Sequence, residues 1–376
     1  MPFLDVEYAA RTDPDFNREL SRLVGQAARQ FRDSKRDPSC IEKHQDTLYS
    51  IIRFCRFNLG FLTPLYFPAY PKDKPMSFIN YPYAFQLFNV NIGGATVIKG
   101  SRQIAKSSAL AARQTLHARL YPGFSSLYIC PRSQFLETYA NRLRDVSRAH
   151  VHYKADHRFR DNLTYKEFPN RSRIELIHVL SDASNARSKS ADELLFDEFQ
   201  EFDPDLELEV EQVQSASEMP ITIYSGTSLT TDTALEAKWD ISSQCYWVMT
   251  CSHCKHDNIP TPEHGVMDMI QQYGVCCAKC GKSINILDGK FIPSYADRCG
   301  LVDGFHIPQL IVPAVVLNEN RWRNIFLKKN TTDPRKFFQE ILGIATEAGE
   351  REITRNHLQA ICILGDSLAK LKAKAQ

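Results

Sequence analysis

Three features that would assign a protein to a common class are missing from this sequence. No apolar run approaches the roughly 20 residues of a membrane-spanning helix, so we expect no membrane partner. The amino terminus has no basic stretch followed by an apolar stretch, so we expect no secretory leader. The formal net charge is only +2, which is too small to indicate a nucleic-acid partner by itself. These absences predict a cytoplasmic protein.

Cysteine, in contrast, is plentiful, with 11 residues among 376. Disulfides are reduced in a cytoplasm, so we expect these thiols either to be buried or to bind metal. Hydrophobic residues make up 43% of the chain, which is enough to bury one large core or two. The composition therefore predicts a globular protein and not a disordered one.

The stretch at 97–113 organises the rest of the interpretation. There a short apolar run meets a turn and then a helix-forming segment. Gly100, Ala105, Lys106 and Ser107 match the phosphate-binding pattern Gly-x4-Gly-Lys-[Ser/Thr], except that Ala105 replaces the second glycine. Because alanine disfavours a positive φ, we expect Ala105 to restrict the loop.

Each part of this pattern has a physical task. Backbone N–H groups of the loop and the positive end of the following helix face the phosphates of a nucleotide. Lys106 reaches the β and γ oxygens, and the Ser107 hydroxyl holds Mg²⁺. We therefore predict that the following residues bind ATP: Gly100, Ser101, Arg102, Gln103, Ile104, Ala105, Lys106, Ser107 and Ser108.

Further along the chain, residues 192–198 read Asp-Glu-Leu-Leu-Phe-Asp-Glu. An apolar strand that ends in two adjacent carboxylates supplies what nucleotide hydrolysis needs. We predict that Asp197 binds the Mg²⁺ ion and that Glu198 orients or deprotonates the attacking water. The alternative is a strand that stops at a charged turn, but the loop upstream in the correct order favours the catalytic interpretation.

Two further positions offer suitable chemistry without deciding between functions. Gln86 precedes the loop, and its amide can pair with an adenine edge or simply lie on a polar helix face. Ser225, Gly226 and Thr227 follow a β-branched strand, where Thr227 can report hydrolysis to a moving part. An ordinary turn from a strand to a loop explains the same three residues.

The spacing of the cysteines is a separate signal. Cys251 and Cys254 form one Cys-x2-Cys knuckle, and after a further 22 residues Cys277 and Cys280 form a second one. Four thiolates bind Zn²⁺ tetrahedrally and leave no open position, so the pattern predicts a structural and not a catalytic metal site.

Residues beside the knuckles add detail to the zinc prediction. Asn258 and Gly281 are expected to shape turns whose backbone amides face the sulfurs. Cys276, His253 and His256 lie in or beside the knuckles, so any one of them is an alternative ligand.

The order of predicted elements is typical of an α/β protein. Helices are expected at 107–120 and 132–151, strands at 126–130 and 221–224, and a hairpin at 165–180. Strands that alternate with helices predict a mainly parallel sheet flanked by helices, with the ligand at the carboxyl ends of the strands. The expected divisions are an N-terminal helical region at 1–62, an ATPase domain at 63–365 that includes a zinc-binding insertion at 247–292, and a tail or linker at 366–376.

Together, these motifs resemble the ATPase part of the terminase large subunit of tailed phages, in the branch that carries Cys-x2-Cys knuckles. The matching segments follow the family's order and cover roughly 80–354. They are residues 82–86, 101–107, 186–192, 194–201, 225–228, both knuckles, 304–310 and 337–343.

The resemblance implies a P-loop NTPase fold of the ASCE type and a motor that hydrolyses ATP to move double-stranded DNA into a procapsid. It assigns Gln86 to adenine and Ser225, Gly226 and Thr227 to coupling. Arg102, inside the loop, matches the family's arginine there and is expected to stabilise the transferring charge. The implied catalytic residues are thus Glu198, Lys106 and Arg102, and the implied cofactors are ATP, Mg²⁺ and Zn²⁺.

The resemblance also implies partners. These are double-stranded DNA, the portal protein, the terminase small subunit, and further copies of this chain in a pentameric ring on the portal. The implied location is the host cytoplasm. Family members usually continue into an RNase H-like nuclease, for which this chain has no room, so we predict no nuclease activity for this polypeptide.

Two other classes of protein share part of the pattern. A DNA helicase or translocase of another P-loop family would have the loop and the carboxylates, but would unwind or move DNA instead of filling capsids. A non-enzymatic, zinc-containing DNA or portal adaptor would keep the knuckles and lack hydrolysis. The ATPase activity of the wild type beside a Glu198→Gln variant distinguishes the adaptor from the other two.

Overall fold

The computed structural model describes residues 81, 83–84, 93–149, 160–179, 184–187 and 189–347. The helical region expected at 1–62, the tail expected at 366–376 and Gln86 all lie outside these described residues. None of the helices in the described ranges combines the length and the apolar character that crossing a bilayer requires.

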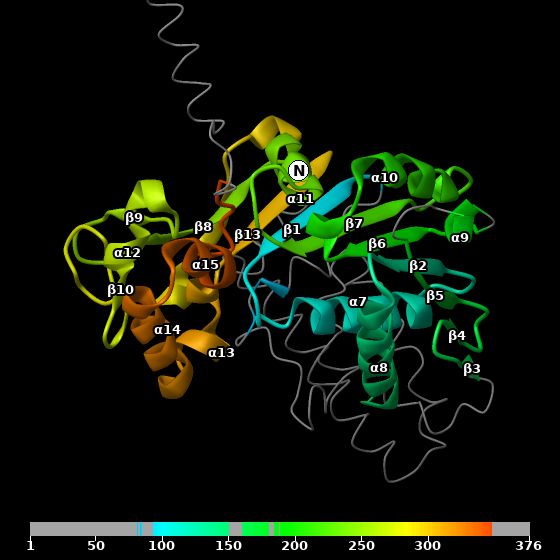
Figure 1. Ribbon diagram of the computed structural model, residues 1–376, viewed down its shortest axis with the longest axis horizontal. Helices are drawn as coiled ribbons and strands as arrows, with labels where there is room; N and C mark the ends of the chain where they lie inside the picture. Colours follow the sequence, from blue (N-terminus) through cyan, green and yellow to red (C-terminus); the bar gives the residue numbers. More distant parts are fainter. Residues whose placement is uncertain are drawn as a thin grey trace, which may run out of the picture.

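A sheet of 11 strands runs through the centre of the described part of the chain (Figure 1). Its strands are β1 (Ala95–Gly100), β2 (Ser125–Cys130), β3 (Arg160–Asp161), β4 (Tyr165–Glu167), β5 (Arg173–His178), β6 (Glu193–Asp197), β7 (Ile221–Thr227), β8 (Cys245–Thr250), β9 (Asp257–Asn258), β12 (Lys290–Pro293) and β13 (Val302–Ile307). Their order is β12-β8-β13-β1-β7-β6-β2-β5-β4-β3, and β9 pairs with β8. Neighbours from β8 to β5 in this order are parallel, whereas β12, β9, β4 and β3 pair antiparallel. The predicted α/β fold with a mainly parallel sheet is confirmed.

Helices cover both faces of this sheet (Figure 1). On one face lie α7 (Lys106–Leu120) and α8 (Ser133–Ala149), and on the other lie α10 (Pro204–Glu211) and α11 (Ala234–Ile241). Residues that alternate along a strand therefore enter two different cores: Leu195 packs with the α7 and α8 side, and Leu194 and Phe196 pack with the α10 and α11 side. Because both faces are buried, the central strands read as continuous apolar runs in the sequence.

The sequences of the helices explain which faces are buried and where a helix begins. In α8, the buried residues Leu136, Tyr139, Leu143 and Val146 recur at helical spacing and face the sheet. In α10, the Asp203 side chain accepts a hydrogen bond from the N–H of Asp205, and proline fills the first helical position. The other α-helices in the described ranges are α9 (Ser184–Arg187), α12 (Val266–Met269), α13 (Pro313–Val316), α14 (Glu319–Thr331) and α15 (Pro334–Phe337), and a π-helical turn, η9 (Phe338–Leu342), follows α15.

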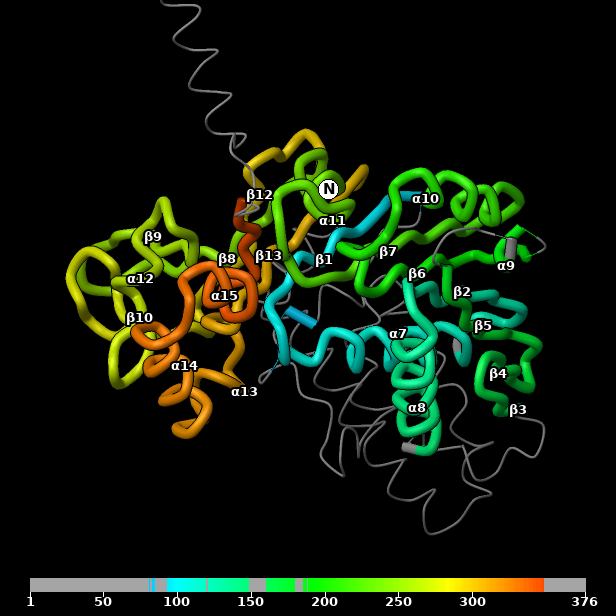
Figure 2. The backbone as a smooth tube through the Cα atoms, viewed as in Figure 1, coloured from blue at the N-terminus to red at the C-terminus, as the bar shows by residue number. Residues whose placement is uncertain are grey.

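The four knuckle cysteines lie on an excursion between β8 and β12. The chain leaves β8, passes through β9, α12 and the small hairpin of β10 (Ile270–Gln271) and β11 (Gly274–Val275), and returns along β12 (Figure 2). Helix α14 contacts this excursion: the Trp322 indole donates to Gln271 O at 3.0 Å, and Lys329 Nζ donates to Met267 O at 2.7 Å. The excursion is therefore held to the main body by side chains of α14.

The carboxyl ends of the central parallel strands meet at one edge of the sheet. Gly100, the last residue of β1, lies opposite Thr227 of β7 and Ile307 of β13, and Asp197 lies opposite Ser225. In open α/β sheets, ligands bind at this edge. The loop at 101–105, the acid pair and the end of β7 are thus adjacent.

Candidate functional site

Lys106 begins α7, and its side chain folds back across the loop that precedes it. Its Nζ donates to Ser101 O at 2.9 Å, to Gly100 O at 3.3 Å and to Thr227 Oγ1 at 3.2 Å. Glycine at the first position of the motif leaves room for this side chain, because a Cβ on Gly100 would lie 2.9 Å from Lys106 Cδ and would displace the lysine. The ammonium is thus held at the meeting point of β1 and β7.

The backbone of the loop takes conformations that favour glycine. Gln103 has a φ of 57° and Ala105 a φ of 67°. The sequence predicted that Ala105 restricts the loop, but the residue instead adopts the left-handed conformation of the glycine that it replaces. This conformation costs a non-glycine residue roughly 1–2 kcal/mol, so other contacts must hold the loop in shape.

Three distant side chains supply these contacts. The carbonyl of Arg102 accepts a hydrogen bond from Gln309 Nε2 at 2.9 Å, and that of Gln103 accepts one from Arg321 Nη2 at 3.0 Å. The buried Tyr83 hydroxyl donates to the carbonyl of the next loop residue, Ile104. Donors from outside the loop thus occupy three consecutive loop carbonyls and fix the shape of its backbone.

The N–H groups of the loop fit the predicted phosphate-binding site. Among the described residues, those of Gln103, Ile104 and Ala105 have no backbone hydrogen-bond partner. The two preceding residues are anchored, because Ser101 N–H donates to Ile307 O at 2.9 Å and Arg102 N–H donates to Glu340 O at 3.0 Å. An anion at the start of α7 therefore meets unpaired donors and the Lys106 ammonium.

Asp197 ends β6 beside this loop and is 3% exposed. Burial is the main reason that the pKa of Asp197 is raised, with Glu198 adding to it, while Lys106 and the nearby hydroxyls of Ser107 and Ser225 act in the opposite direction. The described residues offer its Oδ1 no hydrogen-bond partner within ordinary distance. A buried, underpartnered carboxylate beside a serine hydroxyl is a donor set that suits Mg²⁺.

The charges of the acid pair reach the lysine. Burial lowers the pKa of Lys106, and the carboxylates of Glu198 and Asp197 oppose that shift, while Arg102 adds to it. The three predicted groups, Lys106, Asp197 and Glu198, therefore share one electrostatic environment although they lie far apart in the sequence.

Glu198 follows Asp197 in a left-handed conformation, with a φ of 55°. Its Oε2 accepts a hydrogen bond from Gln200 Nε2 at 2.7 Å. The same Gln200 side chain accepts from the N–H of Thr227 at 3.0 Å through its Oε1. Gln200 was not among the predicted site residues, although it lies two residues after the acid pair and inside the matching segment 194–201.

Of the three predicted coupling residues, Thr227 touches Lys106 through its hydroxyl, as described above. Gly226 has no room for a side chain, because a Cβ there would lie 2.4 Å from Gln200 Oε1 and 2.9 Å from Leu235 Cδ2. Ser225 is fully buried beside Asp197. The end of β7 is thus packed directly against both halves of the site.

Arg102 lies further out than the other loop residues. Its side chain is 62% exposed, and its Nη1 is 3.7 Å from Glu340 Oε1. Of the remaining loop residues, Gln103 is exposed, and Ser107 and Ser108 are half-buried at the start of α7. The catalytic role of Arg102 stays a prediction.

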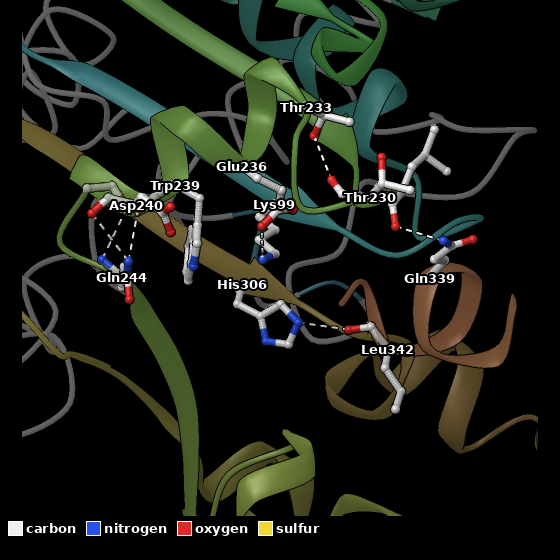
Figure 3. A network of polar contacts seen from close by, with 12 residues as sticks. Lys99, Thr230, Thr233, Glu236, Trp239, Asp240, Gln244, His306, Gln339 and Leu342 are labelled. Carbon is white, nitrogen blue, oxygen red and sulfur yellow. Dashed lines mark hydrogen bonds and ion pairs between the residues drawn. The ribbon is translucent and has the colours of Figure 1, made fainter. Parts of the chain in front are cut away.

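A second set of polar contacts lies at the end of β1, next to the first residue of the loop (Figure 3). Lys99, one residue before Gly100, pairs with Glu236 of α11, and both side chains are about 10% exposed or less. The buried His306 of β13 lies beside this pair, and its Nε2 is 2.8 Å from Leu342 O. Burial, aided by the charge of Lys99, lowers the pKa of His306 to about 3, so its imidazole is neutral.

The segment at 337–347, which contains η9, packs against the loop. Gly343 has a φ of 65°, and a Cβ there would lie 2.8 Å from Ser101 N. Gln339 Nε2 donates to Leu229 O at 2.7 Å and to Thr346 Oγ1 at 2.8 Å. The segments at 304–310 and 337–343, which the sequence singled out without a role, therefore brace the loop and the chain that follows β7.

The second predicted site lies on the excursion. The Sγ atoms of Cys251, Cys254, Cys277 and Cys280 all lie within 4.8 Å of one another, with 3.6 Å between Cys254 and Cys277 and 3.7 Å between Cys251 and Cys280. Tetrahedral Zn²⁺ with bonds of about 2.3 Å sets its sulfurs about 3.8 Å apart, so the four thiols fit this ion. Neither Cys276 nor either neighbouring histidine belongs to the cluster.

Backbone amides face the sulfurs of the cluster. Burial alone would raise the pKa of Cys277, but the N–H groups of Cys280 and Lys279 outweigh it and lower the pKa to about 6. The buried Asn258 joins the two knuckles, because its Oδ1 accepts from Ala278 N at 2.8 Å and its Nδ2 donates to His256 O at 3.0 Å. The Cys277 thiol is thus prepared to bind metal as a thiolate. At Cys254 the N–H of His256 acts in the same direction, but burial and the neighbouring thiols outweigh it and raise the pKa to about 11.

No family model and no curated protein matches the chain. Among solved structures, it is similar to a variant of the large terminase ATPase domain of Thermus phage P74-26, with 12% identity and a TM-score of 0.47 over 73% of this chain and 95% of that one. It is also similar to the large terminase of bacteriophage HK97, with 13% identity and a TM-score of 0.40 over 48% of this chain and 40% of that one. The packaging motor assembly of bacteriophage Phi-29 is 16% identical, with a TM-score of 0.30 over 43% of this chain and 50% of that one. Likenesses at this level do not by themselves assign an activity.

Proposed function

We propose that this chain is an ATPase of the phage terminase type, which hydrolyses ATP and uses the energy to move double-stranded DNA into a procapsid through a portal. One observation carries the proposal: Lys106, Asp197 and Thr227 come from three separate segments and converge at one edge of the sheet. Lys106 Nζ is 3.2 Å from Thr227 Oγ1, and the carboxylates of Asp197 and Glu198 oppose the shift of its pKa.

This arrangement supports a division of labour. The free N–H groups of the loop and the ammonium of Lys106 bind the phosphates, and the hydroxyl of Ser107 with the carboxylate of Asp197 holds Mg²⁺. Bound Mg²⁺ would supply charge neutralisation on the phosphates. Glu198, which is partly exposed at the end of β6, orients the attacking water.

The remaining parts of the proposal come from the sequence resemblance. We assign Gln86 to adenine, Arg102 to the transferring charge, and Ser225, Gly226 and Thr227 to coupling. The portal, the small subunit and other copies of the chain are the proposed partners in the host cytoplasm. The four-cysteine cluster is proposed to hold a structural Zn²⁺, because four thiolates leave it no open position.

ATP turnover of the full chain with Mg²⁺ tests the central claim. The wild type should hydrolyse ATP, and Glu198→Gln should lower kcat by roughly 10²-fold or more while ATP still binds. Equal rates for the two proteins would exclude this site and leave the adaptor interpretation. DNA uptake by procapsids that carry a portal, beside a strand-separation assay, distinguishes a packaging motor from a helicase.

A further inference from the structure

The best-connected polar side chain beside the acid pair belongs to a residue that the proposed chemistry does not use. Gln200 lies in the short 3₁₀ turn η3 (Phe199–Glu201) that follows the acid pair, and it is 8% exposed. Its amide makes one contact on each side: Nε2 donates to Glu198 Oε2 at 2.7 Å, and Oε1 accepts from Thr227 N–H at 3.0 Å.

The orientation of this amide follows from its partners. The N–H of Thr227 can only donate, so it fixes Oε1 on the side of β7 and leaves the NH₂ group for the carboxylate of Glu198. The packing is equally specific, because a Cβ on Gly226 would lie 2.4 Å from Gln200 Oε1. The glycine at that position thus makes room for the glutamine.

The contacts of Gln200 with Glu198 and Thr227 continue to Lys106, the residue that is proposed to bind phosphate. Thr227, whose N–H is bonded to Gln200, contacts Lys106 Nζ through its hydroxyl at 3.2 Å. Glu198, at the other end of these contacts, sits in a left-handed backbone conformation, which costs a non-glycine residue about 1–3 kcal/mol and persists only where its surroundings hold it. The hydrogen bond from Gln200 Nε2 to Glu198 Oε2 is one contact that fixes the direction of its carboxylate.

We propose that Gln200 is a positioning residue, which holds the carboxylate of Glu198 for the attacking water and ties it to the end of β7 that contacts Lys106. The inference rests on the proposed ATPase function and adds a residue to it. Gln200 does not itself touch the nucleotide. Its loss should therefore slow the chemical step and leave the binding of ATP nearly intact.

Two substitutions of Gln200 separate its contacts. Gln200→Met keeps the length of the side chain and removes both hydrogen bonds. Gln200→Glu can still accept from Thr227 N–H, but it cannot donate to Glu198 and adds a like charge beside it. In steady-state assays with ATP and Mg²⁺, both variants should lower kcat roughly 10-fold to 100-fold and change KM by less than about threefold.

Gln214 offers a matched control. It bridges the amino-terminal ends of the same two strands, because its Nε2 donates to Asp192 O at 2.9 Å and to Ile221 O at 2.8 Å, and its Oε1 accepts from Thr222 Oγ1 at 2.9 Å. Gln214→Met should lower the melting temperature about as much as Gln200→Met. Its kcat should stay within about twofold of the wild type.

The outcomes separate this inference from the proposed function. If the wild type does not hydrolyse ATP, or if Glu198→Gln matches it, both ideas fail. If Glu198→Gln is inactive but both Gln200 variants turn over like the wild type, only the positioning role is wrong. A loss of kcat in Gln214→Met equal to that in Gln200→Met would also overturn it, since general destabilisation would then explain both. Should Gln200→Met fail to fold, Gln200→Glu, which keeps the contact with β7, decides alone.

Discussion

The nucleotide site and the cysteine cluster are held in shape by opposite means. The loop at 101–105 depends on donors from far away in the sequence, such as Gln309 and Arg321, and on the register of four parallel strands. The cysteines lie within 30 residues of each other, on an excursion whose own elements are only a few residues long. The shape of the nucleotide site thus depends on contacts across the whole sheet, and the fold of the cysteine cluster should depend on its bound metal.

Metal removal is the strongest way to test this contrast. Chelation should unfold the excursion at 251–289, because apparent binding free energies for structural Zn²⁺ in small zinc folds are about 10–16 kcal/mol. The central parallel strands should stay folded, since they pair with one another and not with the excursion. Protection should fall in part in α14, because its Trp322 and Ile325 share a hydrophobic core with Met269 and Ile270 of the excursion. Hydrogen exchange measured peptide by peptide shows where protection is lost.

Binding of an ATP analogue to the chelated protein completes that test. Arg321 of α14 donates to the carbonyl of Gln103, so a loosened α14 should weaken binding only a few-fold. Loss of protection throughout the sheet on chelation would show that the fold of the nucleotide site also depends on the metal. Unchanged protection at 251–289 would remove the case for a structural metal.

The next largest effect concerns the sheet side of the contrast. Glu236→Gln leaves Lys99 buried without its charged partner, one residue before the loop, and should destabilise the fold by about 3–5 kcal/mol in urea unfolding. Glu209→Gln breaks an exposed pair with Arg187, whose side chains are 41% and 65% exposed, and should cost less than about 1 kcal/mol. The double variant Lys99→Met with Glu236→Leu should recover most of the loss. An equal loss of unfolding free energy in Glu236→Gln and Glu209→Gln would contradict the claim that the buried pair stabilises the sheet.

Acid should also act on the sheet side, through His306. Its folded-state pKa is about 3, below the 6.5 of an unfolded histidine, so between these values the unfolded chain binds the extra proton and stability falls as the pH falls. Between pH 7 and pH 5 this group should cost about 2 kcal/mol. In His306→Gln, whose amide can still donate to Leu342 O, this cost should disappear from urea unfolding curves.

A direct comparison of the two proteins controls for the metal. Acid also releases Zn²⁺ from thiolates, but that loss is common to the wild type and to His306→Gln, so the difference between them isolates the histidine. Above pH 7.5 the two stability curves should run parallel. Parallel curves down to pH 5 would mean that the imidazole is not kept neutral.

These differences also explain what the sequence could predict. Both the cysteine knuckles and the Lys106 loop are short motifs with fixed spacing. Such a motif indicates one kind of site, a zinc site for the knuckles and a phosphate-binding site for the loop. The mainly parallel sheet was predictable because buried strands alternate with helices. The strand order was not, because β13 inserts beside β1 across some 200 residues of sequence, pairing Ala95 with Val302.

The residues that hold the loop in shape could not be predicted from the sequence either, because their partners are also distant in the sequence. Tyr83, Gln309 and Arg321 act on three successive loop carbonyls, and no local pattern announces such pairs. Gln200 was missed because a glutamine after an acid pair has no fixed meaning until the end of β7 is known to lie beside it. The matching segment at 337–343 contains the end of a short helix followed by the π-helical turn, which ends where Gly343 packs on Ser101.

The smallest expected effect lies in the loop itself, at the one position where the motif departs from its pattern. Ala105→Gly should relieve the left-handed strain at a φ of 67°, and after the entropy of the extra glycine in the unfolded chain is subtracted, stability should rise by about 0.5–1 kcal/mol. Ala112→Gly, in the interior of α7, should instead destabilise by about 1 kcal/mol, because helical alanines have no such strain. Urea unfolding of both variants gives the sign. If Ala105→Gly is the less stable protein, the distant donors do not force the loop into its shape, and the alanine contributes to it through contacts of its own.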